Sequence, residues 1–126
     1  FAVWGQVTPR GQDVFRYDIL RQRTTRLQRP RGVFARYDPG VTPAGTTYFG
    51  ESGRGCRPPV ALVRKPRYGR AVVVGRLLPG VDAGYMFALV TRAGTSVLYA
   101  RFSYQGCQAA GGPVGPGAIY EIVDRP

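Results

Sequence analysis

The chain of 126 residues contains no histidine and no asparagine, and it has a single lysine, a single tryptophan and only two cysteines. Without histidine it lacks the side chain that most often acts as a base at neutral pH. Without asparagine it has no acceptor for N-linked sugars. No apolar run approaches the 20 or so residues that a membrane-spanning helix needs, so we expect no transmembrane segment in this chain.

The groups that usually carry catalysis are also scarce. The seven carboxylates are scattered along the chain, and no glycine-rich phosphate-binding or dinucleotide-binding loop occurs. Neither cysteine has a second cysteine nearby, and there is no histidine at all, so a zinc site is not expected. We therefore expect a non-enzyme with no cofactor, no metal and no small-molecule substrate. A compact hydrolase that uses two carboxylates is the third and weakest alternative.

The two cysteines, Cys56 and Cys107, each follow a glycine in a turn-like context. A disulfide between them would close a long loop and stabilise the fold by about 4 kcal/mol. Such a bond indicates an oxidising compartment, so we expect an extracellular or cell-surface protein. The alternative is a pair of free thiols in a cytosolic protein. The chain begins at Phe1 rather than at methionine, which is typical of a processed product or a piece of a longer protein.

Apolar and polar residues alternate with a period of two along much of the chain, and glycine and proline separate the runs. The segment 20–32 is the exception, and it is expected to form at most a turn and a half of helix before Pro30 and Gly32 end it. A single all-β domain over residues 1–126 follows, an antiparallel sandwich or barrel of seven to nine short strands with long basic loops. The expected strands are 1–7, 13–20, 32–37, 46–49, 60–64, 70–78, 84–91, 97–104 and 118–123.

One stretch, GRLLPGVDAGYMFALVTRAGTSVLYARFSY at 75–104, resembles a known corner. Leu77, Pro79, Gly80 and Tyr85 are similar to the E–F corner of fibronectin type III and immunoglobulin-like β-sandwich domains. The resemblance covers about half of the chain and implies a sandwich in which the Tyr85 hydroxyl bonds back to the corner backbone. The spacing from Pro-Gly to Tyr85 is about two residues too long, and segment 20–70 exceeds the family's connection. The family implies no functional residue.

The charge is strongly positive, at +11, and arginine supplies 17 of the 18 cations. Segments 21–36 and 54–76 together hold thirteen cations and no acid. Guanidinium groups form paired hydrogen bonds with carboxylate, sulfate and phosphate oxygens, so these segments are the candidate binding sites. The candidate residues are Arg21, Arg23, Arg26, Arg29, Arg31, Arg36, Arg54, Arg57, Arg64, Lys65, Arg67 and Arg70.

Three interpretations of this charge remain open. The arginines bind an acidic glycan, an acidic lipid or an acidic protein surface, or they neutralise nucleic-acid phosphates while aromatics stack on bases, or they only keep the surface soluble. The expected disulfide favours the first over the second. We therefore expect a structural or binding module that engages an anionic or protein partner, or itself, within a larger assembly. The alternative is a nucleic-acid-associated β protein such as a viral capsid domain.

Overall fold

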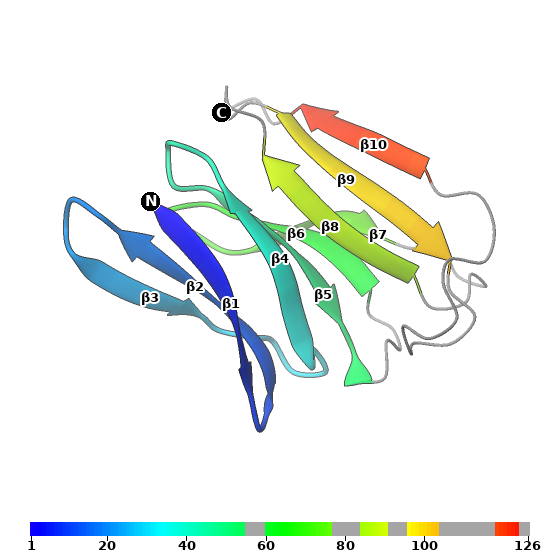
Figure 1. Cartoon of the computed structure of the whole chain (residues 1–126), viewed down its shortest axis with the longest axis horizontal. Helices are drawn as coiled ribbons and strands as arrows, with labels where there is room; N and C mark the ends of the chain where they lie inside the picture. The colour runs from blue at the N-terminus through cyan, green and yellow to red at the C-terminus, as the bar shows by residue number, and fades with distance from the viewer. Residues whose placement is uncertain (55–59, 77–83, 91–95, 104–117, 124–126) are drawn as a thin grey trace.

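The computed structural model describes residues 1–54, 60–76, 84–90, 96–103 and 118–123. Among these residues there is no α-helix, and none forms a helix with the length and hydrophobicity that a membrane crossing requires. The strands are β1 (Ala2–Thr8), β2 (Gly11–Asp18), β3 (Arg23–Leu27), β4 (Ala35–Val41), β5 (Thr47–Ser52), β6 (Val60–Lys65), β7 (Val72–Arg76), β8 (Gly84–Val90), β9 (Ser96–Ser103) and β10 (Ala118–Val123) (Figure 1).

Seven of these strands form one mixed sheet. Its order is β1-β2-β4-β5-β6-β7, with β3 paired to β2 beside this path. The strands β10, β9 and β8 form a separate antiparallel sheet. The all-β prediction is confirmed, but the larger sheet is not purely antiparallel, because β2 and β4 pair in parallel through Gln12 and Ala35. From Val14 onward β2 pairs with β3 on this edge, so the rest of β4 pairs only with β5 among the described strands.

Strand β3 corrects the helical interpretation of segment 20–32. Its residues Thr24 and Thr25 are β-branched and favour extended backbone, and they pair with Tyr17 and Arg16 of β2. The turn before β3 is tight, because the Asp18 carboxylate accepts a hydrogen bond from the Arg21 backbone N–H at 3.2 Å. The neighbouring strand therefore decides the conformation of this segment, which has no apolar alternation of its own.

The centre of the larger sheet is β5, whose six residues are all buried. A strand buried along its whole length must be covered on both faces, because successive side chains point to opposite sides. On one face Phe49 packs with Val14 and Leu27 of the β2–β3 pair and with Ala61 and Val63 of β6. Strand β8 also lies close to β4, β5 and β6.

The corner expected within 75–104 falls mostly outside the described residues. Leu77, Pro79 and Gly80 lie there, as do Cys56 and Cys107, so the corner and the disulfide both stay predictions. Tyr85 lies near the start of β8, where it pairs with Phe102 of β9. The antiparallel pairing of β8 with β9 is the hairpin that the alternation predicted.

Gly11 forms the junction between the β1–β2 hairpin and the rest of the sheet. Its φ is 121°, and a Cβ atom built on it would lie 2.0 Å from the Phe34 carbonyl oxygen. That oxygen accepts hydrogen bonds from the Gln12 N–H at 3.3 Å and from Arg29. A side chain at position 11 would therefore force apart the only place where β2 meets β4.

We expect Gly11→Ala to lower the free energy of unfolding by about 3 kcal/mol or more, because an unfavourable φ adds to a backbone overlap. The matched control is Gly32→Ala, which also has a positive φ, 89°, but meets no atom within 4 Å. It should cost only about 1 kcal/mol. Denaturant unfolding of both variants measures the difference, and equal losses would show that the junction tolerates a side chain.

Candidate anion-binding groove

A groove of about 550 Å³ opens between the β2–β3 pair on one side and the end of β6 with turn 66–71 on the other. Among the described residues that line it, eight are cations and one, Asp18, is a carboxylate. We call it the basic groove. Its cations are Arg16, Arg21, Arg23, Arg26, Arg36, Lys65, Arg67 and Arg70. The fold thus brings together the two acid-free segments, which are far apart in the sequence.

Arg16 links the two sides of the basic groove. It lies on the inward face of β2, beside Val14, and is 8% exposed. Its guanidinium donates hydrogen bonds to the carbonyl oxygens of Gly45 at 2.6 Å, Arg67 at 3.1 Å and Pro66 at 3.4 Å. These bonds satisfy its donors, but carbonyl oxygens do not neutralise its charge. Burial lowers the pKa of Arg16, the positive charge of Arg67 lowers it further, and Asp18 partly opposes both.

Lys65 lies at the end of β6 and adds charge to the same wall. Its ammonium donates to the carbonyl oxygens of Pro66 and Gly69. The pKa of Lys65 is lowered first by burial and then by the positive charges of Arg16 and Arg36. The part of this lowering that comes from Arg16 and Arg36 places Lys65 in a positive potential, which favours the entry of an anion.

Asp18 is the acid that faces this field. Its carboxylate accepts a hydrogen bond from Arg67 at 3.0 Å. Burial raises the pKa of Asp18, but the hydrogen bond from the Arg21 N–H and the charges of Arg67 and Arg21 lower it by more. The Arg67 guanidinium also lies over the rings of Phe1 and Tyr68, at 4.9 and 5.2 Å from their centroids. Arg67 is therefore held in place before any ligand arrives.

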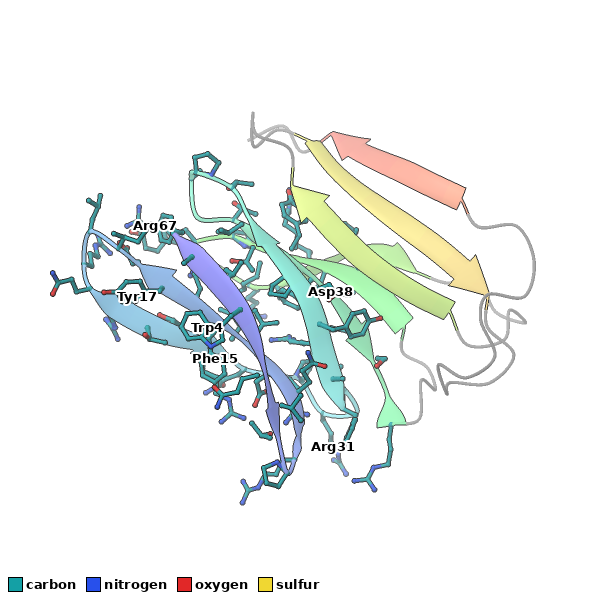
Figure 2. The ribbon with its side chains drawn as sticks, in the orientation of Figure 1. Trp4, Phe15, Tyr17, Arg31, Asp38 and Arg67 are labelled. Carbon is teal, nitrogen blue, oxygen red and sulfur yellow. The ribbon has the colours of Figure 1, made fainter. Side chains whose placement is uncertain are left out.

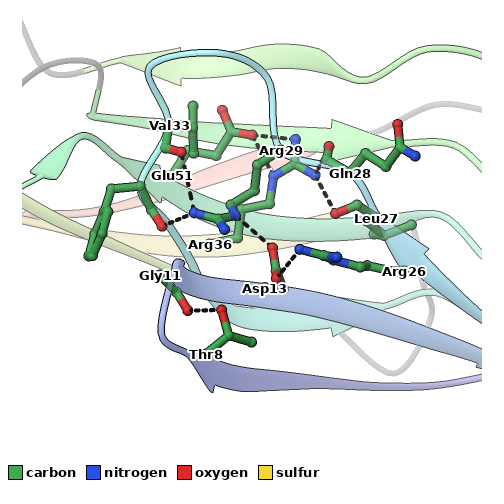
Figure 3. A network of polar contacts seen from close by, with 11 residues as sticks. Thr8, Gly11, Asp13, Arg26, Leu27, Gln28, Arg29, Val33, Arg36 and Glu51 are labelled. Carbon is green, nitrogen blue, oxygen red and sulfur yellow. Dashed lines mark hydrogen bonds and ion pairs between the residues drawn. The ribbon is translucent and has the colours of Figure 1, made fainter.

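Other arginines of the same segments are used inside the protein. Asp13 is fully buried and forms ion pairs of 2.6 Å with both Arg26 and Arg29 (Figure 3). Arg29 also donates to the carbonyl oxygens of Val33 and Phe34. Two guanidinium groups on one buried carboxylate satisfy its oxygens, as a buried charge requires. This cluster fixes the loop between β3 and β4.

Arg36 forms the second internal pair. It is 3% exposed and bonds to Glu51 at 2.6 Å, and it donates to the carbonyl oxygens of Leu27 and Gln28 (Figure 3). Its guanidinium lies over the Phe49 ring at 4.6 Å. Arg36 therefore joins β4, β5 and the end of β3 within the core. It contributes positive charge to the floor of the groove, but its donors are already occupied.

The candidate residues from the sequence divide into groups. Seven of the twelve line the basic groove, namely Arg21, Arg23, Arg26, Arg36, Lys65, Arg67 and Arg70. Arg29, Arg31, Arg54 and Arg64 are described but do not line it, and Arg57 lies outside the described residues. Sequence reasoning missed Arg16 and Asp18, which lie outside the arginine clusters. The available signal was alternation, since Arg16 shares a strand face with the buried Val14.

Comparison of the chain with protein-family models, with curated proteins and with solved structures finds no match. The likeness of 75–104 to a fibronectin type III corner therefore stays a prediction. The function has to be argued from the groove and from the surfaces around it.

We expect Lys65 to titrate below its ordinary pKa, and Arg16→Gln to raise that pKa because it removes a neighbouring positive charge. Since Lys65 is the sole lysine, its ¹³C-dimethylated amine can be followed by NMR across the pH range. The exposed Arg31→Gln, outside the groove, is the control and should leave the titration unchanged.

The lowered pKa also fixes the sign of a stability effect. Between the folded pKa of Lys65 and its higher unfolded value, the unfolded chain binds more protons, so this group makes stability rise with pH in that window. A Lys65 that titrates at or above its ordinary pKa would contradict the positive potential.

Proposed function

We propose that this chain is a non-enzymatic β module that binds an anionic partner in the basic groove. The observation that carries the proposal is the charge of the lining, where cations outnumber carboxylates by eight to one around a single groove of about 550 Å³. Buried charges are ordinarily paired with an opposite charge, yet the buried Arg16 and the half-buried Lys65 donate to carbonyl oxygens. An anion in the groove supplies negative charge to both residues, beyond the part that Asp18 gives to Arg16.

The residues differ in what they give to the ligand. Arg23 and Arg70 are exposed at the rim, so their guanidinium forks bind the anion directly. Arg16 and Lys65 act from below through their field. Arg36 is already paired with Glu51 and mainly holds the shape of the floor. Arg26 is paired with Asp13, but its side chain stays 54% exposed and can contact the ligand as well.

The proposal includes the architecture that the sequence favours. In it, the three-stranded sheet packs as a second layer on β4, β5 and β6, and the closeness of β8 to these strands supports this. The pairing of Cys56 with Cys107 and an extracellular or cell-surface location belong to the same proposal. So does membership in a larger assembly.

Thiol titration of the denatured, unreduced chain shows whether Cys56 and Cys107 form a disulfide. Two free thiols would remove the argument for an oxidising compartment.

The groove is tested with two double variants that remove equal charge. Arg23→Gln/Arg70→Gln removes the exposed cations of the rim, and Arg10→Gln/Arg31→Gln removes two exposed arginines elsewhere. With long-chain polyphosphate as the probe, we expect the rim variant to lose about tenfold or more in affinity. Its slope of log K against log salt should become shallower by about 2, one for each lost phosphate contact.

The control variant should change affinity by less than threefold under the same conditions. Equal losses in both variants would show that the arginines form only a general basic surface. Polyphosphate that does not bind the unmodified chain at moderate salt would overturn the proposed function itself.

A further inference from the structure

The outward face of the β1–β2 hairpin carries a row of aromatic rings. Trp4 and Phe15 are direct cross-strand partners, and their rings are nearly parallel, with an interplanar angle of 12° and centroids 5.5 Å apart. Tyr17 lies two residues beyond Phe15 and therefore on the same face. Figure 2 shows the three side chains over this end of the sheet. We call Trp4, Phe15 and Tyr17 the aromatic strip.

The aromatic strip is partly exposed to water, although aromatic side chains are usually buried. Trp4 is 39% exposed, while Phe15 and Tyr17 are half-buried. Leaving such rings in contact with water forfeits much of the free energy that their burial would supply, and exposed apolar patches on soluble proteins commonly mark binding surfaces. The inward face of β2 already supplies Val14 to the core, so the strip is not needed there.

The aromatic strip lies on the outward face of the β2–β3 pair, whereas the groove residues Arg16 and Thr25 share its inward face, so β3 is the edge strand around which a ligand passes from one to the other. Arg26 is the cross-strand partner of Phe15, so Trp4, Phe15 and Arg26 form one row across three strands, about 10 Å in width. The Arg26 side chain is 54% exposed and also lines the groove. Arg23, at the start of β3, is exposed and lines the groove as well. Two cations thus connect a stacking surface with an anion-binding one.

We propose that the anionic partner is a single-stranded nucleic acid, whose bases stack on the aromatic strip while its phosphates follow Arg26 and Arg23 into the basic groove. This inference rests on the proposed function and names its ligand. Stacking rings beside a cationic track are what sequence-tolerant single-strand binding requires. A sulfated or carboxylated glycan matches the charge of the groove as well, so heparin is the competing probe in the test.

The test compares two probes that differ only in their bases. The full chain is titrated with a thymidine oligomer and with an abasic oligomer of equal length and phosphate spacing. Since Trp4 is the sole tryptophan, its fluorescence reports directly on the strip. We expect the thymidine oligomer to quench this fluorescence and to bind at least fivefold more tightly than the abasic one, since each stacked base adds that much or more.

A variant then locates the stacking. Phe15→Leu keeps an apolar side chain but removes the π face, and we expect it to abolish the preference for the thymidine oligomer while leaving polyphosphate binding unchanged. The matched control is Tyr68→Leu, which removes an exposed ring of the groove wall and should leave the preference intact. If only Tyr68→Leu removes the preference, the bases stack in the groove and the role of the strip is overturned.

The remaining outcomes separate this inference from the proposed function. Equal affinity for both oligomers, with Trp4 fluorescence unchanged, overturns base stacking on the aromatic strip. If polyphosphate binding still depends on the rim arginines, the proposed function of the basic groove stands. Heparin that binds more tightly than the thymidine oligomer, again without a change at Trp4, makes an acidic glycan the partner and overturns the inference. Failure of every polyanion to bind overturns both.

Discussion

The buried guanidinium of Arg16 is the interaction on which the basic groove depends. It reaches from β2 to the carbonyl oxygens of two turns, at Gly45 and at 66–67, which no strand pairing connects to β2. Arginine suits this role because its planar group carries several donors and keeps its charge when buried. The same contact that closes the fold therefore places at the base of the groove a positive charge that Asp18 offsets only in part.

The arginines have two physical roles, and the sequence alone does not show which arginine has which role. Asp13 and Glu51 each recruit arginines into the interior, where paired charges hold the β3–β4 loop and the sheet centre together. Asp18 serves Arg67 and Arg21 at the groove itself, and with few acids available this one carboxylate faces eight cations among the described lining residues. The scarcity of carboxylates, rather than the abundance of arginine alone, makes the groove positive.

Much of the strand layout could be predicted, since each of the nine expected ranges overlaps a strand. Alternation failed at β3, because residues 23–27 present threonine and arginine on both faces and take their conformation from β2. It also could not say which arginines face inward. Arg36 and Arg23 belong to the same cluster, yet only tertiary contacts with Glu51 and Phe49 distinguish the buried Arg36 from the exposed Arg23.

The way in which Arg16 holds the turns has an evolutionary consequence. It binds carbonyl oxygens at 45, 66 and 67, which every amino acid supplies. Substitutions there leave its acceptors in place if the backbone keeps its path, whereas one inserted or deleted residue displaces them. Homologous chains should therefore preserve the lengths of these turns more strictly than their residues. Comparisons based on residue identity would then detect such homologues poorly, because the turn lengths are preserved and the residues are not.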